Sequence, residues 1–173
     1  EGRGSGAAGV GWGLGIGQSL IVPDYAKVIN GGLNAMIKEA EEELKNLRYI
    51  DTDTIKKADF LRSVVIALTA IVRFADRFGD LATEMASKEK DATRKKELRK
   101  IAKTCHWVPA NPARTFYEAM QSFWFIWAMV ADGAKPGGRF DQFMYPFYKK
   151  DKKGGRITDE EVVELLECLR IKV

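Results

Sequence analysis

The residues that could carry chemistry are few, and the most reactive of them are adjacent: Cys105 is followed directly by His106, the single histidine of the chain. A cysteine nucleophile needs an imidazole base within hydrogen-bonding reach of its sulfur. Neighbouring residues of a helix or strand point in different directions, so His106 is poorly placed to activate Cys105. A zinc site needs three or four ligands, and no other histidine or nearby cysteine supplies them. We therefore predict structural roles for both residues.

The other candidate groups are equally incomplete. Acidic pairs such as Glu160–Glu161 fall on exposed helix faces or caps, where nothing makes two carboxyl groups share a proton. The stretch GVGWGLGIG (9–17) has the composition of a phosphate-binding loop, but it does not match GxGxxG and no Gly-Lys-Ser/Thr follows it. Its large apolar residues favour a backbone that passes close to another part of the protein. The residues alone offer no complete catalytic set.

Composition excludes several function classes. With 173 residues the chain has the length of one domain. The net charge is +4, but acids and bases are interspersed even in the most basic run (88–100), so we expect a solvated helix face and no nucleic-acid partner. The most apolar run (116–130) contains Glu118 and is shorter than the ~20 residues that span a bilayer, so we expect no membrane span.

The two cysteines bear on the cellular compartment. They lie far apart in the sequence and form no CxxC pattern, which favours a reduced, cytoplasmic protein. Cys168 stands beside three leucines on the last predicted helix, so we expect it to be a small buried residue.

Hydrophobic periodicity predicts helices after a glycine-rich loop, at 25–47, 55–86, 88–104, 112–131 and 158–169. Asp24 is the expected N-cap of the first helix and Asn111 that of the fourth. Thr158 opens a capping box for the last helix. Gly31 and Gly32 fall inside the first helix, where they indicate a close packing contact or a kink.

Further regions complete the outline. The sequence predicts a turn with an N-cap at 51–54, a short irregular or helical piece over 137–151, and an exposed turn at KKDKKGG (149–155). No strand pattern is found before the final IKV. The predicted fold class is a predominantly α-helical fragment, with a glycine-rich loop at 1–20 and a helical region at 21–173. The 112–131 helix is apolar nearly all round, so we expect it at the centre.

Three segments of the chain together resemble a known family. They are PDYAKVINGGL (23–33), CHWVPANPARTFYEAMQSFWFIW (105–127) and GGRFDQFMYPFYKKDKKGGRITDEEVVELLECLRIK (137–172). Their order, spacing and residue types are similar to those of the glycyl radical enzymes, the superfamily of pyruvate formate-lyase. The resemblance implies that 1–173 is a portion of one pyruvate formate-lyase-like domain, an internal fragment of the N-terminal half.

The resemblance also implies a fold and a chemistry for the full-length protein. The fold is a ten-stranded α/β barrel surrounded by helices, expected to form a homodimer or hetero-oligomer. A radical-SAM activating enzyme installs a glycyl radical, and a cysteine thiyl radical then abstracts hydrogen from a small-molecule substrate. The glycine and cysteine loops of the family do not occur in this sequence and are expected beyond Val173. No catalytic residue and no metal are therefore expected in this segment.

Departures from the family pattern bear on the substrate. Many dehydratase-type members have Gly-His before the 23–33 helix, where this chain has Gly17–Gln18, and a His-Ser element where it has DGAKPGG (132–138). Both differences favour a lyase that makes or breaks a C–C bond of an apolar or aromatic substrate, as in arylacetate decarboxylases or hydrocarbon–fumarate adding enzymes. The alternatives are another glycyl radical enzyme, of the formate acetyltransferase or diol/choline lyase type, or a non-catalytic helical scaffold module.

The same resemblance suggests which residues approach the substrate. We expect Trp12 and Gln18, which precede the 23–33 helix, and Lys135 and Pro136, which precede GGRFDQ, to line the substrate pocket.

The charged residues Arg139 and Asp141 flank Phe140 within an unusually aromatic stretch. Two such charges must be paired and hydrogen-bonded if they are buried. The resemblance implies that they form a structural clamp supporting the 112–131 helix, with direct substrate contact as the alternative.

Overall fold

The computed structural model describes residues 22–48, 51–130 and 137–172, and every regular element within these ranges is a helix. The helices are α2 (Tyr25–Gly31), α3 (Leu33–Asn46), α4 (Thr52–Lys88), α5 (Ala92–Cys105), α6 (Phe116–Met129), α7 (Phe140–Lys153) and α8 (Asp159–Lys172). The predominantly helical class predicted for the fragment is therefore confirmed.

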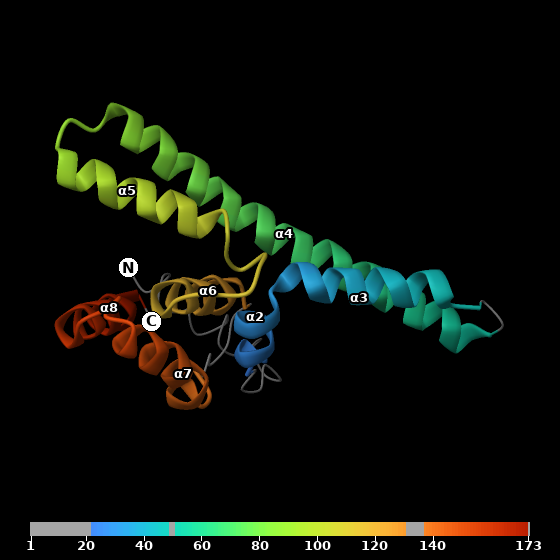
Figure 1. Ribbon diagram of the computed structural model, residues 1–173. Helices are drawn as coiled ribbons and strands as arrows, with labels where there is room; N and C mark the ends of the chain where they lie inside the picture. The colour runs from blue at the N-terminus through green and yellow to red at the C-terminus, as the bar shows by residue number, and fades with distance from the viewer. Residues whose placement is uncertain (1–21, 49–50, 131–136, 173) are drawn as a thin grey trace, which may run out of the picture.

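The helices form two groups. α4 is the longest, and α3 packs along one half of it while α5 packs along the other (Figure 1). The second group consists of α2, α6, α7 and α8, with α6 in contact with the other three. α6 also contacts α4 and α5, so it joins the two groups. This central position is the one expected for a helix that is apolar nearly all round.

Local capping explains several of the helix starts. The Asp24 carboxylate accepts a hydrogen bond from the Lys27 amide at 2.9 Å, and the Asp51 carboxylate accepts one from the Thr54 amide at 2.8 Å. Both aspartates therefore satisfy amides that the first turn of a helix leaves free. The predicted capping box is also present. The Thr158 hydroxyl accepts a hydrogen bond from the Glu161 amide, and the Glu161 carboxylate accepts one from the Thr158 amide.

The first predicted helix is interrupted at Gly32, which separates α2 from α3. Gly32 has φ +76° and ψ 157°, a conformation open essentially to glycine alone. A Cβ at this position would lie 2.6 Å from the Ala110 carbonyl oxygen. The Leu33 amide donates to the Pro109 carbonyl at 2.9 Å, which holds the 106–115 loop against this break. The close packing contact and the kink that the two glycines predicted are therefore both found, and both lie at Gly32.

The fourth helix starts later than predicted. Asn111 does not cap it; its side-chain amide donates to the Trp107 carbonyl at 3.0 Å instead. The N-cap of α6 is Thr115, whose hydroxyl accepts from the Glu118 amide at 3.2 Å. The physical reason is tertiary: the Ala113 amide donates to the Ile29 carbonyl of α2, so residues 112–114 remain extended along α2.

The start of α6 is also held by a buried acid. Asp151, on α7, is 3% exposed, and its carboxylate accepts from the Phe116 amide at 2.7 Å. The same carboxylate accepts from the Arg156 Nε at 2.8 Å. A buried carboxylate is tolerated only with such partners, and here it links the first turn of α6 to the end of α7.

The C-terminal part of the chain is more regular than predicted. Most of the stretch 137–151, expected to be short and irregular or helical, belongs to α7, which begins at Phe140 and continues through Pro146 to Lys153. The turn expected at 149–155 is therefore helical up to Lys153. α8 reaches Lys172, so the residues before Val173 are helical. No residue of α8 is buried.

Candidate functional site

The four predicted pocket residues lie in two segments outside the described residues: Trp12 and Gln18 within 1–21, and Lys135 and Pro136 within 131–136. Their expected role therefore stays a prediction. The residues that follow each segment directly are described, and they show where the two segments join the helical part of the chain.

The two segments join it side by side. Val22 follows the first segment, and Gly137 and Gly138 follow the second. Gly138 has φ +60°, and a Cβ there would lie 3.1 Å from Val22 Cγ1. A Cβ on Gly137 would lie 3.6 Å from Cζ of Phe123, on α6. The two glycines thus let the backbone approach both Val22 and the central helix.

An aromatic cluster supports this junction, and we call it the aromatic platform: Tyr25 of α2, Phe123 of α6, and Phe140 and Phe143 of α7. The ring of Phe123 lies 4.6 Å from that of Tyr25 and 5.0 Å from that of Phe140, centroid to centroid. Phe143 stacks on Tyr25 at 5.8 Å. Tilted and edge-on contacts at these distances stabilise aromatic pairs beyond simple burial. Three helices therefore meet at one cluster of aromatic rings.

The platform contains one polar atom of interest, the hydroxyl of Tyr25. Tyr25 is 2% exposed, and its hydroxyl has no hydrogen-bond partner among the residues that the structure describes. Burial raises the pKa of this phenol, so it stays protonated and can donate a hydrogen bond. Burying a hydroxyl without a hydrogen-bond partner costs free energy.

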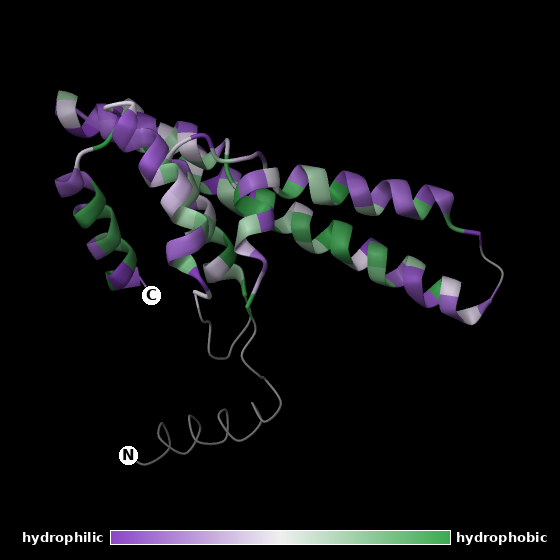
Figure 2. Ribbon diagram, turned by 60° about the horizontal axis from the view of Figure 1, so that its bottom comes forward, coloured by the Kyte–Doolittle hydropathy of each residue, from purple (hydrophilic) through white to green (hydrophobic). Residues whose placement is uncertain are grey.

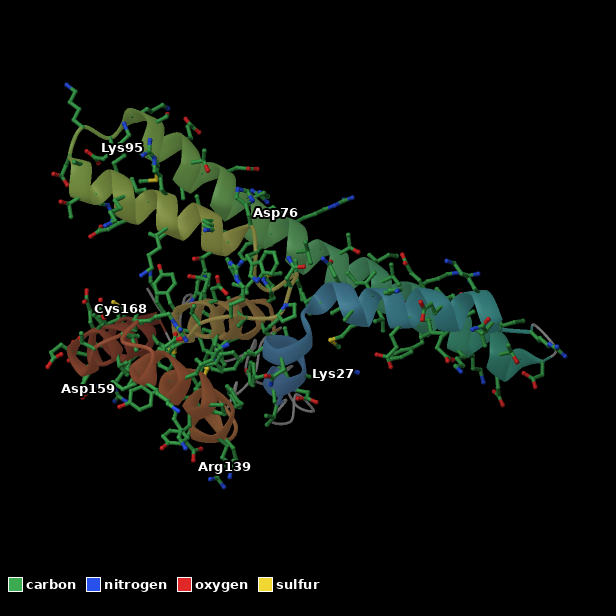
Figure 3. All side chains as sticks on the ribbon, in the orientation of Figure 1. Lys27, Asp76, Lys95, Arg139, Asp159 and Cys168 are labelled. Carbon is green, nitrogen blue, oxygen red and sulfur yellow. The ribbon has the colours of Figure 1, made fainter. Side chains whose placement is uncertain are left out.

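Arg139 and Asp141 bind each other through two hydrogen bonds, although neither side chain is buried. The guanidinium donates through Nε to Oδ1 at 3.1 Å and through Nη2 to Oδ2 at 3.0 Å. The hydrogen bonds from Arg139 lower the pKa of the Asp141 carboxyl. Both side chains are 69% exposed in this chain, and Figure 3 shows Arg139 pointing away from the helices at one end of α7. The pair is therefore on the surface here, and its role as a clamp stays a prediction.

His106 lies where α5 ends, next to α4. Its Nδ1 lies 3.2 Å from Asp76 Oδ1 and its Nε2 3.6 Å from Asp80 Oδ1. The ring also packs on Gly79, where a Cβ would lie 2.6 Å from Nε2. His106 thus joins the end of α5 to successive turns of α4, an arrangement that fits a structural role.

The two cysteines differ in their surroundings. Cys105 is 4% exposed, and burial raises the pKa of its thiol to about 11, so it is a poor nucleophile at neutral pH. Cys168 is exposed, so the expectation that it is buried is wrong for this chain. The leucines next to Cys168 on α8 pack against α6. Cys168 itself lines an open groove beside α6, and its position on α8 is labelled in Figure 3.

Within the described ranges, no group of three or more histidine, cysteine or acidic residues is arranged to hold a metal ion. None of the helices there is long and apolar enough to cross a membrane.

Two buried acids that hold the start of α6 could not be predicted from their local sequence. Asp151 occurs within a run of lysines that reads as solvent-exposed, yet it caps α6. Glu118 is 8% exposed and accepts hydrogen bonds from both the backbone and the guanidinium of Arg114. The only sequence signal for either is its place inside a segment that resembles the family.

Comparison with known proteins extends this description. Residues 11–173 match the family described as pyruvate formate lyase-like. Isethionate sulfite-lyase of Nitratidesulfovibrio vulgaris is 44% identical over 154 residues, which are 86% of this chain and 19% of that protein. Indoleacetate decarboxylase of Tractidigestivibacter scatoligenes is 32% identical over 156 residues, 87% of this chain and 17% of that protein.

A solved structure supports the same relationship. The glycerol-bound glycerol dehydratase of Clostridium butyricum superposes with a TM-score of 0.81 at 43% identity, covering 88% of this chain and 20% of that one. The chain thus spans about a fifth of the length of the relatives that it matches. Because the match covers nearly the whole chain in both sequence and fold, this chain belongs to the pyruvate formate-lyase-like family of glycyl radical enzymes.

Proposed function

We propose that the full-length protein is a glycyl radical enzyme that eliminates a small leaving group, such as water or sulfite, from a small polar substrate. The observation that carries this proposal is the order of similarity among the relatives. Identity is 44% to a sulfite-lyase and 43% to a glycerol dehydratase, against 32% to an aryl decarboxylase, over similar shares of the chain. This order favours the diol-lyase alternative over the aromatic C–C lyase expected from the sequence.

The residue types in the two predicted pocket segments suit a polar ligand. Lys135 carries an ammonium group that can bind an anionic substituent, and the Gln18 amide can both donate and accept hydrogen bonds. Trp12 and Pro136 would supply apolar walls, as is usual in small-molecule sites. The contact between Val22 and Gly138 supports the proposal that both segments serve one pocket.

In this proposal the chain supplies binding and support, and the reacting radicals lie elsewhere in the protein. The glycyl radical, installed by a radical-SAM activating enzyme, would provide the thiyl radical that abstracts a hydrogen atom from the substrate. The aromatic platform would hold the pocket segments in place, and the Tyr25 hydroxyl within it is a neutral hydrogen-bond donor without a partner among the described residues. Fixing such groups before the substrate binds lowers the cost of orienting it.

A substrate panel tests the proposal. The full-length protein is activated without oxygen by a radical-SAM activating enzyme and offered isethionate, glycerol, 1,2-propanediol and indoleacetate in parallel. We expect release of sulfite, or a carbonyl product of dehydration, from one of the first three substrates. Release of carbon dioxide from indoleacetate, with the other three unchanged, would contradict the proposal.

A second candidate, arylacetate decarboxylation, is favoured by the replacement of the family's Gly-His by Gly17–Gln18 and by the similarity to indoleacetate decarboxylase. The same panel separates the two, because only decarboxylation releases carbon dioxide. A non-catalytic scaffold would leave every substrate unchanged and form no radical.

A further inference from the structure

An exposed apolar surface lies in the middle of α4. Ile66 is 71% exposed and Phe60 is 67% exposed. Ala67 and Ala70 are exposed next to Ile66. Figure 2 shows hydrophobic residues gathered in the part of α4 that lies beside α3, with hydrophilic residues towards the N-terminal end of α4. An apolar patch that the other described helices leave uncovered is typical of an interface.

Opposite charges stand at the two ends of this apolar surface. Asp59 and Arg77 are separated by eighteen residues, five full turns, so both point to the same side of α4. Ile66 and Ala70 lie on that side between them. The Asp59 side chain is 67% exposed and binds Arg62 of its own helix at 2.9 Å. Arg77 is exposed, and no acid among the described residues pairs with it. Its guanidinium is therefore available to an incoming carboxylate.

This order of residues is complementary to its own reverse. Asp59 and Arg77 lie nine residues either side of Leu68, and Ile66 and Ala70 lie two residues either side of it. A second α4 that runs antiparallel about a two-fold axis at Leu68 therefore brings Asp59 to the partner's Arg77 and Ile66 to the partner's Ala70. The two-fold axis repeats each of these contacts. A parallel second copy would instead place each charge beside its own equivalent, which is unfavourable.

Two aromatic residues extend the match along one edge of the surface. Phe60 and Phe78 are also five turns apart, so they lie on the same edge of α4. Phe78 is 39% exposed, and its ring lies 5.0 Å from that of Phe74, centroid to centroid. The antiparallel copy places Phe60 beside the partner's Phe78, where two exposed rings gain an aromatic neighbour.

We propose that the surface of α4 from Asp59 to Phe78 is a self-association interface, at which a second copy of the full-length protein packs its own α4 antiparallel to the first. The small side chains of Ala67 and Ala70 allow the two helices to approach closely at the centre, and the charge pairs fix their direction and register. A second copy is the partner that this surface fits, because the same residues supply both signs of charge in reverse order. The interface is separate from the aromatic platform of α2, α6 and α7.

A charge swap tests the pairing. In the full-length protein, Asp59→Arg or Arg77→Asp alone should raise the dimer dissociation constant about tenfold, because either change places like charges together at two symmetric contacts. The double variant should restore the original value. Asp59 and Arg77 are about 27 Å apart along one helix, so this rescue requires contact between copies.

Sedimentation velocity over a dilution series measures the dissociation constant. Lys96→Asp, at an exposed position of α5, is the control and should leave it unchanged. A monomeric full-length protein, single variants with an unchanged constant, or a double variant that dissociates as readily as the single variants would each overturn the proposal.

Photo-cross-linking identifies what covers the surface. The photoreactive amino acid p-benzoylphenylalanine replaces Phe60 in the full-length protein, and illumination is followed by a denaturing gel and peptide mapping. We expect a covalent dimer whose link lies within one helical turn of the partner's Phe78. A link to position 60 of the second copy, a link within one polypeptide, a link to a different protein, or no link at all would contradict the antiparallel interface. The same amino acid in place of Tyr145, which is 57% exposed on α7, is the control and should give no covalent dimer.

Discussion

At the scale of single residues, two positions tolerate few other residue types: one because of its backbone conformation and one because of a buried charge. Gly32 adopts a conformation that other residues avoid and lies against the loop before α6. Asp151 is the only acid that reaches the first turn of α6 from α7 among the described residues. Neither role depends on catalysis, so both can be tested by stability alone.

Replacing Gly32 by alanine should be strongly destabilising. The change adds about 1–3 kcal/mol of backbone strain and a Cβ that meets the Ala110 carbonyl oxygen at 2.6 Å. Gly31→Ala is the matched control, since nothing lies within 4 Å of a Cβ there and the helix gains up to about 1 kcal/mol. The thermal midpoint of the full-length protein should fall for Gly32→Ala alone. Equal midpoints for the two variants would show that the break between α2 and α3 is not required.

Replacing Asp151 by alanine should cost about 1–3 kcal/mol, because the buried Phe116 amide loses its acceptor. Asp151→Asn keeps one oxygen to accept from this amide, but it loses the charge interaction and the hydrogen bonds with Arg156, whose donors would then face the asparagine NH2; it should still cost less than alanine, which leaves the Phe116 amide without an acceptor. Thermal unfolding of both variants and of the unchanged protein measures the order of their stabilities. An asparagine variant less stable than the alanine variant would contradict the capping role.

The Cys105 thiol makes a pH-dependent contribution to stability. Its pKa is raised by burial from an ordinary 9.0 to about 11, so the folded state disfavours the thiolate. The stability is fully present below pH 9 and is lost as the pH rises through 11, by about 2–3 kcal/mol in total. We expect Cys105→Ala to flatten the fall of the thermal midpoint over this range. Parallel pH profiles for the two proteins would count against it.

At the scale of elements, most helices could be predicted because their signals are local. Apolar periodicity and the Asp24 and Thr158 caps are encoded within a few residues, and the structure has them. The start of α6 could not be predicted, because Ala113 is held by a hydrogen bond to Ile29, a residue distant in sequence. The exposure of Cys168 could not be predicted either, because it depends on which other elements pack against α8 and not on the sequence of α8 itself.

The junction between Val22 and Gly138 links the elements to the proposed pocket. Gly138→Ala forces a side chain onto a residue with φ +60° and pushes its Cβ to 3.1 Å from Val22 Cγ1. We expect KM for the substrate to rise about tenfold, because the added Cβ would shift the proposed pocket residues that follow or precede this junction by up to about 1 Å.

Gly155→Ala is the matched control for this junction. Gly155 has φ +63°, and nothing lies within 4 Å of a Cβ there, so the variant carries the same backbone strain without the contact. Both variants should lose about 1–2 kcal/mol of stability, and only Gly138→Ala should change KM. A KM that changes equally in both would refute a positioning role for the junction.

At the scale of the whole molecule, the described part of this chain is helical, and the chain spans about a fifth of the length of the glycyl radical enzymes that it matches. Family membership rests on a match over nearly its full length, while the reacting glycine and cysteine are expected in the remaining four-fifths. The predicted pocket residues Trp12, Gln18, Lys135 and Pro136 could be proposed only from the resemblance, since no local pattern marks a substrate contact. What the described part contributes is the aromatic platform, next to which Val22 and Gly138 approach each other.

The most direct measurement is electron paramagnetic resonance of the full-length protein after activation without oxygen by a radical-SAM activating enzyme. We predict a doublet signal from a glycyl radical, which collapses to a single line when the protein is made with glycine deuterated at the α-carbon. An activated protein that shows no such doublet, or a signal that glycine deuteration leaves unchanged, would contradict the assignment of a working glycyl radical enzyme.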